Sequence, residues 1–418
     1  MIDKKIMKIF TIFSLHLYLL PAVIWAEDFP PAQNLSSGTT LFAKIRSEGM
    51  VYVDKTAFIE KILQFSQPPF ILLTRPRGFG KTTFVDTLYE FFSGNKALFD
   101  DTYIAKQIPG NWTKYPIIRL NFSFIRPINS DADIDRYRED LADRLRSIGK
   151  EHGLDPASRR YSYIDLLIED LKRKYGQPVI VLIDEYDEIF KKVNPKDPKL
   201  FSQFMKVAIA FFHIVISQSD NLELVFITGI SRLSMSDGID GMRYGVPYMC
   251  IEDMTFNKKF SSAMGFTLDE IKSNYGPSLQ RWATHDGVST STVIQNLTHW
   301  YDGYRFSLED NETRVFNPIS VINTFMNLKI DKYWAKSVKI DTEIERTMKM
   351  SEKKMDEFFH CKVKAKDLES LYDNEFSFEV PPAILLHNYG YLTIRKYNQS
   401  SGTVILSYPN EEIKSLMT

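Results

Sequence analysis

With 418 residues, 44% of them hydrophobic and 25% charged, the chain has the composition of a globular protein long enough for two or three domains. Its composition, with two cysteines, excludes a disulfide scaffold. Cys250 and Cys361 form no C-x-x-C pair, which excludes the usual zinc and redox patterns. Both are predicted to be buried free thiols. The formal net charge of -1 gives no long-range attraction to nucleic acid or to an anionic membrane surface.

The N-terminal residues 1–26 have the order of a secretory signal peptide, because three lysines among the first eight residues precede an apolar run that ends at Ala26. This leader predicts export or membrane association. An uncleaved anchor, an interfacial helix and a wrongly chosen start codon stay open. Residues 27–40 contain Pro30, Pro31 and Gly38 and are predicted to form a linker.

Residues 41–255 are predicted to form an α/β core. Short β-branched and apolar runs alternate there with longer helical patterns, which is typical of a mostly parallel sheet covered by helices. The predicted strands are Phe70–Thr74, Ile117–Phe122, Val179–Ile183, Leu224–Thr228 and Tyr248–Ile251.

A glycine-rich string lies between the first predicted strand and an amphipathic helix. It reads Arg75-Pro76-Arg77-Gly78-Phe79-Gly80-Lys81-Thr82-Thr83. Strand, glycine loop and helix in this order predict a phosphate-binding loop, in which backbone N–H groups and the helix N-terminus surround phosphate oxygens. Lys81 would contact the β- and γ-phosphates, Thr82 would place its hydroxyl on Mg²⁺, and Thr83 has no required role. The residues predicted to bind nucleotide are Arg77, Gly78, Phe79, Gly80, Lys81, Thr82 and Thr83.

The third predicted strand ends in two acids, Asp184 and Glu185. A buried parallel strand that delivers carboxylates at its C-terminal end is where a phosphate-loop fold needs its metal ligand. Asp184 is therefore predicted to hold Mg²⁺ together with Thr82. Glu185 is predicted to orient or deprotonate the water that attacks the γ-phosphate.

The fourth predicted strand ends in polar residues that could lie beside the attacking water. Thr228 is the first candidate and Ser231 the second, with local backbone hydrogen bonding as the alternative role for the threonine. Arg232, Arg75 and Arg77 are candidates for stabilising charge during phosphoryl transfer. Spacing does not select among the three arginines.

Residues 256–418 are predicted to form a mainly helical domain that ends in a β-hairpin. Helix-forming segments include Leu268–Tyr275 and Asp341–Phe359, and two β-rich runs at 389–397 and 403–407 predict the hairpin. Glu412-Ile413-Lys414 is an E-x-K string of the kind found in metal-dependent nucleases, but it is expected to lie too near the C-terminus to have a supporting core.

From about residue 35 onward the chain resembles the bacterial AAA-ATPase-like proteins, which often carry a C-terminal PD-(D/E)XK nuclease domain. The matching strings are Tyr52-Val53-Asp54-Lys55-Thr56, Thr74 to Lys81, Leu182-Ile183-Asp184-Glu185-Tyr186-Asp187, Gly265-Phe266-Thr267, Trp300-Tyr301-Asp302-Gly303-Tyr304 and Asn317-Pro318. The family loop T-R-P-R-R-F-G-K-[ST] also has arginine at the position of Arg75. Gly78 replaces the second arginine of the family's R-R pair, the one that follows Arg77, which should loosen the loop.

The resemblance implies an α/β P-loop NTPase fold of the AAA/STAND type, with ATP and Mg²⁺ as cofactors. It identifies residues 390–393 and 409–412 as similar to the segment that precedes the family's nuclease domain. The chain is therefore expected to be the ATPase part alone, with no nuclease activity of its own. Nucleic acid is a partner only by family association, and the net charge does not support it.

The function expected is Mg²⁺-dependent ATP hydrolysis that drives a conformational switch. The alternative is an ATP-binding regulatory module with little turnover, a remnant of an ATPase-nuclease protein. A small-molecule kinase would need an acceptor pocket walled by the C-terminal domain. A protein partner and a homo-oligomer stay open, and localisation is divided between the exported leader and a body that needs cytoplasmic ATP.

Overall fold

The structure is a computed structural model that describes residues 30–35, 38–65, 69–155, 157–193, 197–232, 251–309, 313–337, 360–369 and 381–417. The predicted leader, the predicted helix at 341–359 and Cys250 lie outside these residues. Cys361 is half-buried rather than buried as predicted.

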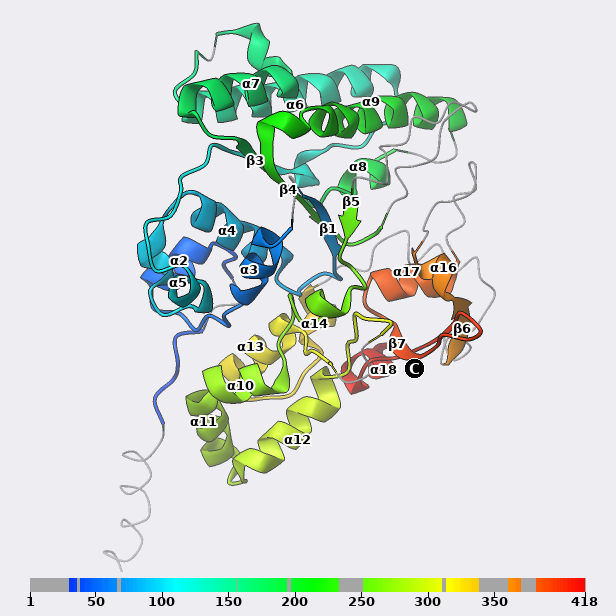
Figure 1. Cartoon of the computed structure of the whole chain (residues 1–418). Helices are drawn as coiled ribbons and strands as arrows, with labels where there is room; N and C mark the ends of the chain where they lie inside the picture. Colours follow the sequence, from blue (N-terminus) through cyan, green and yellow to red (C-terminus); the bar gives the residue numbers. More distant parts are fainter. Residues whose placement is uncertain are drawn as a thin grey trace, which may run out of the picture.

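A five-stranded sheet forms the core of the molecule, in the order β2-β3-β4-β1-β5, with every adjacent pair parallel (Figure 1). Its strands are β1 Phe70–Thr74, β2 Ile117–Asn121, β3 Val179–Asp184, β4 Leu222–Gly229 and β5 Ile251–Asp253. The predicted parallel sheet is confirmed. Because helices cover both of its faces, β1 and β3 are buried throughout rather than alternately buried and exposed, and they are apolar up to their last residues.

Helices pack on the two faces of the sheet in separate groups (Figure 1). One group surrounds Phe84 and Leu88 and the other surrounds Leu167 and Phe204. The first comprises α2 Phe42–Ser47, α3 Ala57–Leu63, α4 Lys81–Phe92 and α5 Tyr103–Gln107, and the second comprises α6 Asp131–Glu151, α7 Ile164–Tyr175 and α9 Pro198–Ser217. By length and composition α9 could cross a membrane, with a mean hydropathy of 1.7, but its Phe204 and Phe212 are buried against the sheet.

The part of the chain after β5 is mainly helical, as predicted. Its helices are α10 Leu268–Asn274, α11 Gly276–Asp286, α12 Thr290–Tyr301, α13 Pro318–Asn327, α14 Tyr333–Ser337, α16 Ala365–Glu369, α17 Pro382–Asn388 and α18 Glu411–Met417. The short α8 Glu188–Lys191 and the 3-10 turns η1 Lys96–Phe99, η2 Phe122–Phe124, η3 Arg159–Ser162, η4 Ser219–Asn221 and η7 Lys258–Phe260 complete the described helices.

The predicted hairpin is present as β7 Thr393–Asn398 and β8 Thr403–Ser407. A third strand, β6 Cys361–Lys364, pairs with β8 in the same antiparallel sheet. The sequence did not predict β6 because its four residues are alternately half-buried and exposed, with no apolar run. Helix α18 follows the hairpin, so the hairpin is not the last element.

The C-terminal helices pack directly against the loop between β1 and α4. The Phe79 ring meets Tyr304 and Phe306 edge-on, with ring centroids 4.8 and 5.2 Å away. One buried cluster therefore runs from the sheet into the C-terminal region, across the predicted boundary at residue 255. The division into two domains stays a hypothesis. A separate cluster around Tyr275 and Tyr301 holds α10 to α13 together.

Candidate nucleotide-binding site

The loop between β1 and α4 turns at two glycines with left-handed backbone. Gly78 has φ +81° and Gly80 has φ +91°, conformations that side chains with a Cβ rarely adopt. A Cβ on Gly80 would meet no atom within 4 Å, whereas a Cβ on Gly78 would lie 2.9 Å from Ile319 Cδ1 and 3.2 Å from Asn317 Nδ2. Gly78 therefore makes room for α13 on the loop, a reason for glycine that the sequence did not reveal.

Lys81 is the first residue of α4 and is only 4% exposed. Its ammonium lies 3.4 Å from the carbonyl oxygen of Pro76, within the same loop, and 3.7 Å from Glu185 Oε1. A buried ammonium is costly unless anions or carbonyl groups surround it. The loop thus holds one cation at the point where its backbone turns.

The Asp184 carboxylate lies beside the start of α4. Thr82 Oγ1 donates a hydrogen bond to Asp184 Oδ2 at 2.8 Å, and Asn121 Nδ2 donates to the same oxygen at 3.2 Å. Asp184 is 1% exposed. The structure therefore brings together the hydroxyl and the carboxylate that the sequence assigned to Mg²⁺. Asn121 was missed, although its place at the C-terminal end of the neighbouring strand was a usable signal.

Glu185 follows Asp184 in an unusual backbone conformation, with φ +52°. A non-glycine residue in this region is strained, and such strain is concentrated at functional sites. Burial raises the pKa of the Glu185 carboxyl, while the nearby Lys81 ammonium opposes that shift. The side chain is half-buried and can exchange protons with water, as a general base must.

Asp187, two residues further on, connects the end of β3 with the end of β4. Asp187 is fully buried, accepts hydrogen bonds from the backbone N–H groups of Ile230 and Ser231, and pairs with Lys191 at 2.7 Å. Burial opposes ionisation there, but Lys191 and the backbone donors together lower the pKa of Asp187. A Cβ on Gly229 would lie 2.2 Å from Asp187 Oδ1, so this close approach requires glycine. No role for Asp187 is predicted from the sequence.

The polar residues at and after the end of β4, which are candidates for a role beside the attacking water, make structural contacts. The buried Thr228 hydroxyl donates to the carbonyl oxygen of Leu73 at 2.6 Å. Arg232 forms an ion pair with Asp253 and donates to the carbonyl oxygen of Leu368 in α16. Ser231 donates its backbone N–H to Asp187. Roles for Thr228, Ser231 and Arg232 beside an attacking water stay predictions.

Arg75 acts as a bridge between the end of β1 and the segment after β5. Its guanidinium, 1% exposed, donates to the carbonyl oxygens of Thr74, Thr255 and Phe260 and lies over the Phe306 ring. Burial lowers the pKa of Arg75 to about 9. These contacts explain why an arginine occupies a position that is usually glycine in such loops.

Arg77 and Thr83 lie at the edge of the site. The Arg77 side chain is 37% exposed, and one of its nitrogens is 4.0 Å from Glu188 Oε1. Of the three candidate arginines, Arg77 is the most exposed to solvent. Thr83 lies in the first turn of α4, where its carbonyl oxygen accepts a hydrogen bond from the Thr87 hydroxyl.

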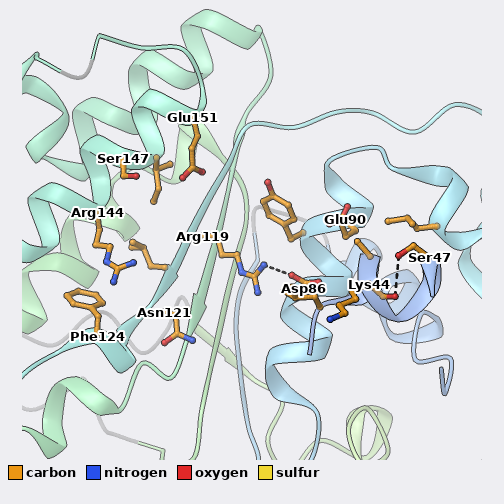
Figure 2. A pocket seen from close by; sticks show the side chains of 16 residues that line it. Lys44, Ser47, Asp86, Glu90, Arg119, Asn121, Phe124, Arg144, Ser147 and Glu151 are labelled. Carbon is orange, nitrogen blue, oxygen red and sulfur yellow. Dashed lines mark hydrogen bonds and ion pairs between the residues drawn. The ribbon is translucent and has the colours of Figure 1, made fainter. Parts of the chain in front are cut away.

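A cleft of about 740 Å³ lies beside the edge strand β2, between α2 and α4 on one side and α6 on the other (Figure 2). Asn121 lines it, and an ion pair between Arg119 and Asp86 crosses it. All of its lining residues precede residue 152. This cleft is therefore not walled by the C-terminal region, where a kinase acceptor pocket was expected.

The residues present fit a nucleoside triphosphate and a magnesium ion. Mg²⁺ prefers few protein oxygens and takes the rest of its ligands from phosphates and water, and Thr82 and Asp184 offer that set. The α4 N-terminus and the loop N–H groups supply the positive ends of backbone dipoles. Residues Thr82 and Asp184 would hold the metal, and residues 77–83 would surround the phosphates.

Residues 36–239 match a family described as a predicted AAA-ATPase. Over these residues, just under half of the chain, the sequence is similar to the AAA-ATPase-like family. An uncharacterized protein from the vnfD 5' region of Azotobacter chroococcum mcd 1 is 26% identical over 310 residues, which are 72% of this chain and 54% of that protein. The chain thus spans about half the length of this relative.

Three solved structures are similar at low scores. The ORC2 protein of Aeropyrum pernix, with ADPNP and ADP, has a TM-score of 0.32 and 11% identity, covering 94% of this chain and 95% of that one. The ORC1 protein of Aeropyrum pernix in complex with DNA has a TM-score of 0.28 and 11% identity, covering 94% of this chain and 95% of that one. A RuvB mutant of Thermotoga maritima has a TM-score of 0.24 and 14% identity, covering 90% of this chain and 95% of that one. At these scores the likeness carries no argument about function.

The fold of this AAA-ATPase-like chain follows from its own sheet and loop. A parallel sheet with a glycine loop after β1 and acids after β3 is the arrangement of P-loop NTPases, so the predicted fold class is confirmed. The expectation for Glu412 was wrong: it is 0% exposed and lies within the core, although it is close to the C-terminus. Both of its side-chain oxygens accept hydrogen bonds from other helices.

Proposed function

We propose that this AAA-ATPase-like chain binds ATP together with Mg²⁺ and hydrolyses it, and that hydrolysis moves the C-terminal region against the P-loop core. One observation carries the proposal: the Thr82 hydroxyl lies 2.8 Å from the Asp184 carboxylate, next to the buried Lys81. Loop, metal ligands and base candidate come from two stretches of sequence about 100 residues apart, residues 75–83 and the pair Asp184-Glu185. Their convergence on one point supports phosphate chemistry.

Each residue of the site has a role in this proposal. Lys81 neutralises charge on the β- and γ-phosphates, and Thr82 and Asp184 hold the metal. When bound, Mg²⁺ would draw charge from the phosphate oxygens. Glu185 accepts a proton from the attacking water, a role that its raised pKa favours. Arg77, at the rim of the loop, is the arginine best exposed for contact with a phosphate.

Two adjacent threonines provide the test of this proposal. Thr82→Ala should weaken Mg²⁺-dependent ATP binding about tenfold or more by calorimetry, since it removes a metal-ligand hydroxyl. Thr83→Ala, one position further along α4, should bind like the unaltered protein, because the substitution keeps the backbone of residue 83 and no role is predicted for its side chain. Lys81→Ala should abolish binding. Equal affinities in all four proteins would contradict the proposed function.

An ATP-binding regulatory module with little turnover is the second candidate. The observation that favours it is the engagement of Thr228 and Arg232 in structural contacts, with the Leu73 carbonyl and with Asp253. Neither then assists the attacking water without rearrangement. Phosphate release in a single-turnover assay separates the two candidates, since both predict binding and only the first predicts hydrolysis.

Partners other than ATP are proposals of lower rank. A homo-oligomer or a protein partner would be consistent with a switch whose output is a domain movement. The net charge of -1 does not favour nucleic acid. We propose no nuclease activity for this chain.

A further inference from the structure

Side chains of the C-terminal region donate hydrogen bonds to the backbone of the phosphate loop. The carbonyl oxygen of Arg77 accepts a hydrogen bond from Trp334 Nε1 at 2.9 Å and a longer one from Asn317 Nδ2 at 3.4 Å. Both donor residues are 0% exposed. Because the peptide unit is planar, fixing the Arg77 carbonyl also fixes the direction of the Gly78 N–H group. That N–H is one of the loop donors expected to face a phosphate.

Packing prevents the Trp334 ring from leaving this position easily. The ring meets Tyr391 edge-on, with centroids 5.1 Å apart. A Cβ placed on Gly390 would lie 2.9 Å from Pro76 Cβ and 3.4 Å from the indole. Gly390, with φ +90°, therefore allows the loop and the indole to pack together.

One buried carboxylate holds the two elements that carry these donors. Glu412 in α18 accepts a hydrogen bond from the backbone N–H of Trp334 through Oε1 and from the Ser320 hydroxyl through Oε2, each at 2.8 Å. Ser320 lies in the first turn of α13, which Asn317 caps. The same glutamate thus ties α18 to α14 and α13, and each of those helices presents one donor to Arg77.

A second contact keeps α18 in place. Lys332, just before α14, donates its ammonium to the carbonyl oxygen of Ser415 near the end of α18 at 2.6 Å. Helix α18 therefore joins the assembly through both of its turns. Displacing it would release Glu412 and with it the alignment of the two donors.

We propose that Glu412, Trp334 and Asn317 are positioning residues of the nucleotide site, which set the peptide between Arg77 and Gly78 and couple the docking of α18 to nucleotide affinity. The inference rests on the proposed ATP binding. Linkage requires reciprocity: if docked α18 tightens binding by some factor, bound nucleotide stabilises docked α18 by the same factor. The C-terminal helix is then the element through which the state of the loop is reported.

The grip on Arg77 is tested with two tryptophan variants. Trp334→Phe keeps a buried aromatic ring but removes the indole N–H, and it should raise the Kd for ATP roughly five- to tenfold, the effect of one lost hydrogen bond. Trp282→Phe is the matched control, because Trp282 is 2% exposed and donates its indole N–H to Asp286, away from the loop. The control should leave the Kd unchanged. Thermal unfolding without nucleotide reports whether both variants are folded.

The role of Glu412 is tested by conservative rescue. Glu412→Ala should weaken ATP binding, while Glu412→Gln, whose amide can accept from the Trp334 N–H and donate to Ser320, should restore most of it. Glu411→Ala on the same helix, half-exposed and paired with Lys414, is the control. Hydrogen exchange adds a readout that a merely structural role would not move: ATP should slow exchange in residues 411–417 of the unaltered protein, and less so in Trp334→Phe.

The outcomes separate this inference from the proposed function. If the unaltered protein binds no ATP, the proposed function fails and the inference with it. If it binds ATP but folded Trp334→Phe binds equally well, or if ATP leaves exchange in residues 411–417 unchanged, the positioning role is overturned and the proposed function stands. A selective loss in Trp334→Phe and Glu412→Ala, with rescue by glutamine, supports the inference.

Discussion

At the scale of single residues, the site contains a contact that nucleotide binding must rearrange. The Lys81 ammonium lies 3.7 Å from Glu185 Oε1, so the cation expected to meet the phosphates is already next to a carboxylate. Both groups are largely buried, where a charge interaction is stronger than in water. Glu185 therefore serves hydrolysis and opposes binding at once.

The change Glu185→Gln should abolish turnover and also tighten ATP binding several-fold. The amide cannot act as a base, and it removes the negative charge that competes with phosphate for Lys81. Calorimetry with Mg²⁺ and ATP gives the affinity, and phosphate release gives the rate. Glu169→Gln in α7, whose carboxylate pairs with Arg160, serves as the control. Turnover at the unaltered rate in Glu185→Gln would place the base elsewhere.

At the scale of elements, the interface between the phosphate loop and α13 depends on Gly78. The residue is at once left-handed and in contact with Asn317 and Ile319, so two costs would arise from any side chain there. Gly80 carries only the first of these costs, because no atom lies within 4 Å of its Cβ position. A comparison of substitutions at Gly78 and Gly80 therefore separates the cost of left-handed backbone from the cost of contact with α13.

Gly78→Ala should therefore destabilise the protein more than Gly80→Ala. Each substitution incurs about 1–2 kcal/mol of left-handed backbone cost, and Gly78→Ala adds the contact with Ile319. Adding Ile319→Ala should reduce the extra loss in Gly78→Ala but leave Gly80→Ala unaffected. Chemical denaturation of the single and double variants measures this coupling. Equal effects at both glycines would mean that α13 does not press on the loop.

At the scale of the whole molecule, stability should depend on the protonation of Glu412. Burial raises the pKa of this carboxyl from its ordinary 4.5 to about 7, and its hydrogen bonds from Ser320 and Trp334 lower it only in part. Asp331 also raises the pKa, and the neutral Tyr301 and Tyr304 face the same region. The folded state thus binds this proton more tightly than the unfolded chain does.

The stabilisation from that proton is complete below pH 4.5 and is lost as the pH rises through about 7. The 2.5-unit difference corresponds to about 3 kcal/mol at most. Glu412→Gln should remove this dependence. Between pH 4.5 and 7 the unfolding free energy of the unaltered protein should therefore fall relative to that of the variant. Glu411→Gln should follow the unaltered protein. Parallel curves for all three proteins would contradict the buried, protonated state of Glu412.

The sequence by itself determined the local parts of this AAA-ATPase-like protein. The strands β1 and β3 were predictable because each is an apolar run. The loop was predictable because Gly80 and Lys81 stand between a strand and a helix, and the acids because Asp184 ends a strand. The hairpin β7–β8 followed from two β-rich runs around a turn. Such features depend on neighbouring residues, which a sequence displays directly.

Only the tertiary structure decided which distant residues share the site. Asn121 reaches Asp184 because β2 and β3 are adjacent, and Trp334 reaches Arg77 because α14 packs on the loop 257 residues away in sequence. Arg75 is a candidate for phosphate chemistry in the sequence and a buried bridge in the fold. The sequence predicts no supporting core for Glu412 because of its nearness to the C-terminus, yet its side chain is 0% exposed. Burial and long-range hydrogen bonds arise when elements pack, and no local pattern specifies them.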